Sequence, residues 1–370
     1  MWLGILAAVL AATGAGAAYM IACVGRYGFV RKLAGEKKLL RHLISALVIA
    51  VVFAAVSLTL STVNAVIVFL HFVLVYLLFG GITRIFCAAT GRDKDKSEGV
   101  RKVLQGIIAP VFTIGYLAVG MYLVYNVWQT DVSLTTKKPV GTLKVALFAD
   151  SHLGTTFGGE GFAEHMERIN AQDPDIVLLA GDYVDDGTDR DDMIRACEAL
   201  GAMDAKYGVW YCYGNHDEGY FNRRNFTAAD LEENLRKNGV HFLADEYELV
   251  GDSLCIVGRK DRSDPDRMAA GELINGLPED RYIIVLDHQP ADYTAEAETP
   301  ADLVVSGHTH GGQLFPITYV GEWIGANDRT YGHEQRNGTD FLVTSGISDW
   351  EIKFKTGTKS EYMMINIEQQ

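Results

Sequence analysis

The chain has 370 residues, of which 48% are hydrophobic, and a formal net charge of −14. This hydrophobic content excludes a disordered protein, and the acidic balance argues against nucleic-acid binding, which needs a basic surface to neutralise phosphates. The charge changes sign at about residue 130. Up to Thr130 there are 12 Lys and Arg against 4 Asp and Glu, whereas the rest of the chain has 21 against 43. The sequence therefore has a basic, apolar first part and an acidic, more polar second part.

Four long apolar stretches fill the first part. They predict helices over residues 2–24, 43–60, 63–82 and 103–128. A helix needs about 20 residues to cross the roughly 30 Å hydrocarbon core of a bilayer, which each stretch approaches or exceeds. We therefore expect residues 1–130 to form an all-α anchor of about four transmembrane helices, followed by a linker over residues 131–142.

Basic residues in the short loops between these helices predict the orientation. Two groups lie between the first and second stretches and between the third and fourth: Arg26, Arg31, Lys32, Lys37, Lys38 and Arg41; Arg84, Arg92, Lys94, Lys96, Arg101 and Lys102. Loops rich in Lys and Arg stay in the cytoplasm. The pattern predicts a multi-pass protein of the cell membrane, with everything after Trp128 on the extracytoplasmic side. Three spans would place that part in the cytoplasm instead.

Short apolar runs alternate with helix-like segments from Leu143 onward, which is typical of an α/β domain. The predicted strands are 143–149, 176–180, 209–213, 283–286, 303–305 and 341–344, and the predicted helices are 162–171, 191–203 and 228–238. Five of these strands run directly into polar clusters: Asp150-Ser151-His152, Gly181 to Asp185, Gly214 to Asp217, Asp287-His288 and Gly307 to His310. Because functional residues of open α/β sheets lie beyond the carboxyl ends of the strands, these clusters are expected to converge on one site.

The residue types in these clusters are those that bind divalent metals. Two Asp, one Asn and four His would suffice for two ions if one carboxylate bridges them. The set contains oxygen and imidazole but no thiolate, which suits Mn²⁺, Fe²⁺, Co²⁺ or Zn²⁺. Any single His among them has the alternative of being an ordinary buried residue.

These motifs, DxH, GDxxD, GNHD, a single His and GHxH, resemble the calcineurin-like metallophosphoesterase superfamily over residues 143 to 368. The runs Gly307 to Gln313 and Gly181 to Asp185 are similar to the membrane-anchored bacterial YkuE/YaeI-like phosphoesterases. That group includes enzymes that cleave the pyrophosphate of UDP-diacylglucosamine. The resemblance implies a four-layer α/β fold over residues 143–370, in which two mixed β-sheets are flanked by helices, and two divalent ions, with Mn²⁺ favoured.

The resemblance also assigns roles to residues. It implies that Asp150, His152 and His310 hold one metal, that Asn215, His288 and His308 hold the other, and that Asp182 bridges the two. His216 would contact the scissile phosphate and protonate the leaving oxygen. Asp185 would orient the His216 imidazole, with a turn residue as the alternative interpretation, and Asp217 is a further candidate acceptor.

The sequence departs from the Ser/Thr protein phosphatases of this superfamily at two positions. Asp186 and Gly219 stand where those enzymes have phosphate-gripping arginines, which argues against a phosphoprotein monoester substrate. Arg223, Arg224 and Arg329 are weak candidates to replace them. The loop from Leu314 to Ile324 carries Phe315, Ile317, Tyr319, Val320 and Trp323, which predicts either core packing or an apolar lip for an acyl chain.

The sequence thus predicts a membrane-anchored di-metal phosphohydrolase. It would cleave a phosphodiester or pyrophosphate bond by attack of a metal-bridging hydroxide, and the substrate would be a phosphate ester, such as a lipid head group or cell-envelope polymer. The alternatives are a broad-specificity phosphomonoesterase and a non-catalytic metal-binding membrane module. Nucleic acid is not expected as a partner, and the sequence leaves protein partners unknown.

Overall fold

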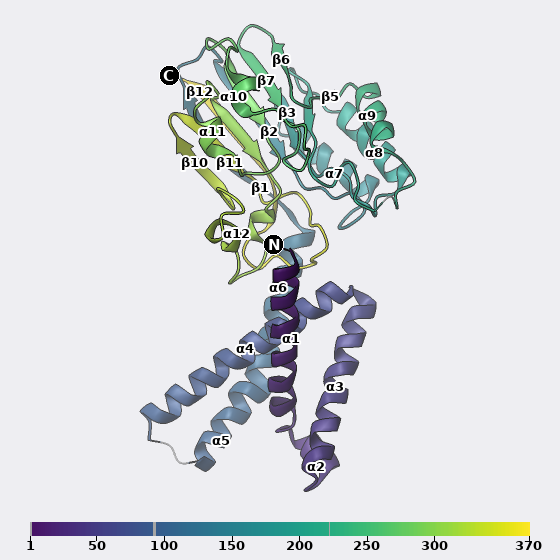
Figure 1. Cartoon of the computed structure of the whole chain (residues 1–370), viewed down its shortest axis with the longest axis vertical. Coiled ribbons are helices and arrows are strands. Elements are labelled where there is room, and N and C mark those ends of the chain that lie inside the picture. The colour runs from purple at the N-terminus through teal and green to yellow at the C-terminus, as the bar shows by residue number, and fades with distance from the viewer. Residues whose placement is uncertain (1, 92–93, 222) are drawn as a thin grey trace. The chain divides into compact units, whose positions relative to one another are not determined.

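The computed structural model describes residues 2–91, 94–221 and 223–370, so Arg92, one of the predicted cytoplasmic charges, lies outside the described residues. The chain divides into two compact units (Figure 1). The helical unit comprises Met1–Val119 with Glu351–Lys353, and the α/β unit comprises Gly120–Trp350 with Phe354–Gln370. Each unit has hydrophobic clusters of its own.

Helices alone form the first part of the chain. Its elements are α1 (Trp2–Val24), α2 (Gly28–Ala34), α3 (Lys38–Thr59), α4 (Thr62–Ala89), α5 (Lys94–Val103), a π-helical segment (Leu104–Ile108) and α6 (Ala109–Tyr125). Four helical stretches in the described residues are long and apolar enough to cross a membrane: Leu6–Val24, Lys38–Thr59, Thr62–Ala89 and Ser97–Tyr125. Four N-terminal helices that could span a membrane, as the sequence predicts, are thus confirmed.

Only a small core holds the helical unit together. Met20 and Cys23 of α1 pack with Val73 and Tyr76 of α4 and with Ala109 of α6. Most other large apolar side chains of these helices point outward, and Leu58 of α3 is 89% exposed. Such a surface is satisfied by lipid, because lipid tails are as apolar as leucine.

Two mixed sheets, each of six strands in the described residues, build the α/β unit. In spatial order the first contains β1 (Val127–Thr136), β12 (Ser360–Gln369), β2 (Thr142–Phe148), β3 (Ile176–Ala180), β4 (Val209–Cys212) and β5 (His241–Phe242). The second contains β10 (Gly332–Arg336), β11 (Thr339–Val343), β9 (Leu303–Ser306), β8 (Tyr282–Leu286), β7 (Leu254–Gly258) and β6 (Glu246–Val250). Strands β2 to β5 and β7, β8, β9 and β11 run parallel, whereas β12–β2, β6–β7 and β10–β11 are antiparallel pairs.

Residue alternation along the strands produces four layers. Leu143, Val145 and Leu147 of β2 face the second sheet, whereas Ala146 and Phe148 face helices. The helices α7 (Gly159–Asn170), α8 (Arg190–Gly201) and α9 (Ala228–Lys237) cover the first sheet, as Figure 1 shows. The shorter α10 (Ala270–Ile274) and α11 (Tyr293–Glu296) cover the second. The predicted fold class, two mixed sheets flanked by helices, is confirmed.

One strand lies where the sequence predicts a linker. Residues 131–136 of the expected linker belong to β1, which pairs in parallel with β12 along its whole length. Because β1 is an edge strand, few of its side chains are buried. Its sequence therefore has no continuous apolar run and resembles a polar linker. Its pairing ties the residues that follow the last apolar helix into the first sheet.

Candidate metal centre

The five polar clusters meet where the carboxyl ends of the two sheets come together. Asp150 and His152 follow β2, Asp182 follows β3, and His216 follows β4. From the second sheet, His288 follows β8, and His308 and His310 follow β9. Three groups have their ligand atoms within 4.8 Å of one another: Asp150, His152 and His310; His152, Asp182 and His216; Asp182, His288 and His308.

Asp182 is the centre of this arrangement. Its Oδ2 lies 3.1 Å from Nε2 of His288 and 3.5 Å from Nε2 of His152. The carboxylate thus belongs to one group that includes His152 and to another that includes His288 and His308. This is the position that a bridging ligand between two cations would occupy.

The donor atoms of the site fit a cation. Nε2 of His152 and Nε2 of His288 are buried and make no hydrogen bond to any described residue. Nδ1 of His288 lies 2.8 Å from the carbonyl oxygen of Ala180, which accepts only from a protonated nitrogen, so in the neutral imidazole the lone pair that a metal ion needs is on Nε2. A buried polar atom without a partner is costly, and a bound metal ion satisfies it.

Electrostatics separates these histidines into two kinds. Burial, helped by neighbouring imidazoles, lowers the pKa of His308 to about 4 and holds that of His310 well below its usual range. Both imidazoles are therefore neutral at physiological pH, which metal binding requires. Burial also acts to lower the pKa of His288, but the Asp182 carboxylate outweighs it and raises that pKa. A positive charge next to Asp182 is thus favoured.

The predicted catalytic pair is in contact. Oδ1 of Asp185 lies 3.0 Å from Nδ1 of His216, and Oδ2 of the same carboxylate lies 3.3 Å from Nδ1 of His152. Burial acts to raise the pKa of Asp185, but its contacts with His152 and His216 outweigh burial and lower it. Asp185 therefore stays ionised, hydrogen-bonds and orients the imidazole of His216, and lies next to that of His152, which a simple turn residue would not do.

Asn215 takes part in a different set of contacts. Its Nδ2 donates to the hydroxyl of Tyr220 over 2.8 Å, and its Oδ1 lies 3.5 Å from Nε2 of Gln289. Gln289 in turn donates to both carboxylate oxygens of Asp261. The side-chain oxygen of Asn215 is thus held weakly, in keeping with the predicted role as a ligand.

An unusual backbone aims these side chains. Nine non-glycine residues in the described part of the chain have positive φ, and five of them are predicted ligands: Asp150, His152, Asp182, His308 and His310. Positive φ is uncommon for such residues and gathers at functional sites. The chain also approaches itself closely here, because a Cβ at Gly307 would lie 2.7 Å from Oδ2 of Asp150. Only glycine fits that position.

Asp217 supports the site through the backbone. Its fully buried carboxylate accepts hydrogen bonds from the amides of Asp182, Tyr183, Val184 and Gly214. These bonds hold the turn that presents Asp182 against the turn that presents Asn215. Asp217 is therefore a hydrogen-bond acceptor, and the groups that donate to it are four backbone amides.

Sequence reasoning missed a buried ionic network behind His288. Asp287 accepts from Arg259 over 3.0 Å and from Arg267, and Arg259 also donates to the buried Glu296 over 2.9 Å. Lys355 is another buried cation, whose ammonium donates to the carbonyl oxygens of Ser345 and Ser348. None of these cations lies in a motif, so spacing carries no signal for them.

The three arginines that could replace the phosphate-binding arginines of the Ser/Thr protein phosphatases already contact other groups of the protein. Arg224 donates to the carbonyl oxygen of Asp217 over 2.9 Å, and Arg329 pairs with Glu334 over 3.1 Å. Arg223 lies over the Phe221 ring at 5.4 Å. Asp186, at one of the arginine positions, accepts from the amides of Tyr220 and Phe221 and so shapes the loop beside His216.

The loop after the last motif is exposed, so its core-packing interpretation is wrong. Phe315 is 60% and Trp323 is 73% exposed, and Ile317, Tyr319 and Ile324 are exposed as well. Close to the catalytic pair, the rings of Tyr220 and Trp350 lie 5.0 and 5.6 Å from that of His216. Both aromatic side chains are exposed.

Comparison with known proteins agrees with this site. Residues 143–312 match the family model described as calcineurin-like phosphoesterase. An uncharacterized metallophosphoesterase of Aquifex aeolicus is 32% identical over 50% of this chain and 70% of its own length. A Danio rerio protein named transmembrane protein with metallophosphoesterase domain is 26% identical over 84% of this chain and 73% of its own length.

The resemblance to the membrane-anchored bacterial group is also confirmed. The uncharacterized metallophosphoesterase YkuE of Bacillus subtilis is 24% identical over 60% of this chain and 78% of its own length. The matched region of the family model contains all the clusters described above. The chain therefore belongs to the calcineurin-like phosphoesterase family and is a metal-dependent phosphoesterase.

Proposed function

We propose that this protein is a membrane-anchored, di-metal phosphohydrolase that cleaves a phosphodiester or pyrophosphate bond in a lipid head group or cell-envelope substrate. The observation that carries the proposal is the position of Asp182 between two groups of ligand atoms. The proposed ligands are Asp150, His152, Asp182, Asn215, His288, His308 and His310, with His216 and Asp185 as the catalytic pair. We take Mn²⁺ as the metal.

The residues of the site divide the chemistry between them. Two divalent cations in such a site supply positive charge that stabilises phosphoryl oxygens in the transition state. Asp185 accepts from Nδ1 of His216, so that in the imidazolium form the second proton lies on Nε2, from which the leaving oxygen can receive it. Asp217 keeps the turn carrying Asp182 in place through four backbone amides.

Charge near the site favours a substrate with a single negative charge per phosphate. A phosphomonoester dianion is usually gripped by arginines, but Arg224 and Arg329 are bound elsewhere and Asp186 adds a negative charge. Exposed aromatic rings next to His216, together with the exposed apolar loop, support a substrate with an apolar portion.

Placement outside the cytoplasm rests on the loop charges. With four helices able to span the bilayer, the basic segments after the first and third are cytoplasmic by the positive-inside rule, and the α/β unit is extracytoplasmic. Fusion of alkaline phosphatase to the C-terminus tests this. We expect the alkaline phosphatase fusion to be active. An inactive phosphatase fusion, together with a fluorescent fusion of green fluorescent protein at the same position, would place the α/β unit in the cytoplasm instead.

Activity is tested on the full-length protein in neutral detergent, stripped with EDTA and reloaded with Mn²⁺. We expect hydrolysis of bis(p-nitrophenyl) phosphate at least about tenfold faster than of p-nitrophenyl phosphate, because the monoester dianion lacks its arginine clamp. A preference for the monoester would instead support the broad-specificity phosphomonoesterase. No turnover of either ester by metal-loaded protein would contradict the proposal.

A further inference from the structure

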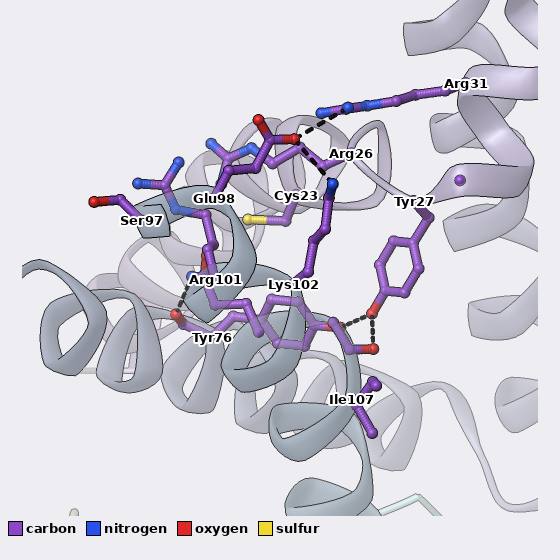
Figure 2. Close-up of a pocket in the computed structure, with 13 residues that line it drawn as sticks. Cys23, Arg26, Tyr27, Arg31, Tyr76, Ser97, Glu98, Arg101, Lys102 and Ile107 are labelled. Carbon is purple, nitrogen blue, oxygen red and sulfur yellow. Dashed lines mark hydrogen bonds and ion pairs between the residues drawn. The ribbon is translucent and has the colours of Figure 1, made fainter. Parts of the chain in front are cut away.

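The helical unit contains a cavity of about 700 Å³ (Figure 2). None of the residues that line it belongs to the metal centre. Its walls come from the end of α1, the start of α2, the middle of α4, and α5 with the π-helical segment. Four cationic side chains and one carboxylate line it: Arg26, Arg31, Arg101, Lys102 and Glu98. The cavity therefore carries a net positive charge.

The cations of this cavity are not all neutralised. Glu98 pairs with Arg31 over 3.2 Å and with Lys102 over 3.5 Å. Arg26 and Arg101 make no hydrogen bond or ion pair to any described residue. Figure 2 shows both guanidinium groups on the side of the cavity where Glu98 and Ser97 lie, opposite Tyr27. Two guanidinium groups that line one cavity and have no partner among the described residues are suited to a phosphate, which they bind through paired N–H groups.

The floor of the cavity is polar and rigid. The hydroxyls of Tyr27 and Tyr76 lie 2.6 Å apart, and Tyr27 also donates to the carbonyl oxygen of Gly106 over 3.1 Å. The buried amide of Gln105 donates to the carbonyl oxygen of Tyr76 over 2.8 Å. Gly106 and Gln105 belong to the π-helical segment, a distortion that occurs frequently at functional sites. These bonds join Tyr27, α4 and the π-helical segment along one side of the cavity.

We propose that this cavity, defined by Arg26, Arg31, Arg101 and Lys102 above Tyr27, Tyr76 and Gln105, is a second binding site that takes a phosphate-bearing anion. Basic pockets between transmembrane helices bind anionic head groups, and each Lys or Arg near an anionic surface contributes about 1 kcal/mol. The proposal is independent of the phosphoesterase activity, because every lining residue belongs to the helical unit.

Binding is measured by native mass spectrometry of the full-length protein in neutral detergent with EDTA, so that the metal centre does not consume the lipid. The probes are dioleoylphosphatidylglycerol and, as the neutral comparison, dioleoylphosphatidylcholine. We expect the anionic lipid to bind at least about tenfold more tightly, and Arg26→Gln with Arg101→Gln to weaken its binding roughly 30-fold, through loss of two charges.

Two further variants keep the proposal falsifiable. Lys37→Gln with Lys38→Gln removes the same charge from exposed residues that do not line the cavity, and should change the affinity less than about threefold. Glu98→Gln should tighten binding several-fold, because it releases Arg31 and Lys102. A gain of affinity cannot arise from misfolding. The proposal would be overturned if the Lys37/Lys38 and Arg26/Arg101 variants lost equal affinity for phosphatidylglycerol, or if Glu98→Gln bound this lipid more weakly. It would also be overturned if the wild-type protein did not prefer phosphatidylglycerol to phosphatidylcholine.

The source of the phosphate is decided by competition with glycerol 1-phosphate. Displacement of phosphatidylglycerol by millimolar glycerol 1-phosphate, sensitive to the same arginine pair, assigns the site to a soluble phosphate compound. Resistance to that competitor, with arginine-dependent lipid binding, assigns it to a phospholipid head group. Both results support the phosphate site, and failure of both probes to bind would contradict it.

Discussion

The two units differ in which side chains they bury and which they expose. In the helical unit, leucines such as Leu58 are exposed and only a handful of the described residues form a core, whereas in the α/β unit the central strands of each sheet are buried on both faces. The α/β unit instead buries charge, in Asp150, Asp182, Asp217 and Arg259. The surroundings explain the difference: lipid satisfies an apolar surface, and only a site that binds cations or paired ions justifies several buried carboxylates.

The largest effect is expected at the carboxylate shared by the two ligand groups. Asp182→Asn should lower the rate on bis(p-nitrophenyl) phosphate by at least about 1,000-fold, because an amide cannot supply the negative charge that two cations share. Asp173→Asn is the matched control, since Asp173 also has positive φ but is exposed and outside the site. Comparable rates for the two variants would contradict the role of Asp182.

The next comparison concerns packing in the two units. Ile256 is fully buried between the two sheets, so Ile256→Ala should lower the free energy of unfolding of the α/β unit by about 2–5 kcal/mol. Leu58→Ala removes a side chain of similar size that is 89% exposed, and should change thermal stability in detergent little. Thermal unfolding followed by circular dichroism measures both. Equal destabilisation would mean that the helical unit packs more tightly than described.

A smaller effect is expected at the positioning carboxylate. Asp185→Asn should reduce kcat on the diester about 10- to 100-fold, because the uncharged amide is a weaker acceptor for the His216 imidazole that Asp185 orients. The exposed Asp204→Asn serves as control and should retain full activity. If Asp185→Asn is as active as the control, Asp185 is only a turn residue.

The smallest expected effect sharpens the substrate class. Phe315→Ala with Trp323→Ala should reduce turnover of a lipid-linked diester about 3- to 10-fold and leave bis(p-nitrophenyl) phosphate unaffected, because only the lipid offers an apolar portion to these rings. Tyr247→Ala with Leu249→Ala removes two exposed apolar side chains of β6 as a control. Equal losses on both substrates would eliminate the apolar loop as a determinant of specificity.

Prediction from sequence succeeded where a local pattern carries the information. Strands β3, β4, β8 and β9 are buried on both faces and β2 is buried over its second half, so each contains a short apolar run that leads into a ligand motif. Long apolar helices are equally evident. The edge strand β1 was not expected, because half of its residues face solvent and its register depends on β12, more than 200 residues away.

Contacts formed only by the folded chain were also not predictable. Arg259 is buried because Asp287 and Glu296 reach it from two other elements, and no spacing in the sequence links the three. The cavity of the helical unit depends in the same way on segments far apart in the sequence, because it is lined both by Arg26, which follows α1, and by Arg101 of α5. The pairing of Asp185 with two histidines is a further example, since the motif indicates one.

Metal stoichiometry tests the central claim most directly. The full-length protein, stripped with EDTA, reloaded with excess Mn²⁺ and dialysed, is analysed by inductively coupled plasma mass spectrometry alongside Asp182→Asn. We expect two Mn²⁺ per wild-type chain and fewer than one in the variant, because both ligand groups contain Asp182 or adjoin it. One ion or none in a wild-type protein that hydrolyses the diester, or two ions retained by Asp182→Asn, would contradict the shared di-metal centre.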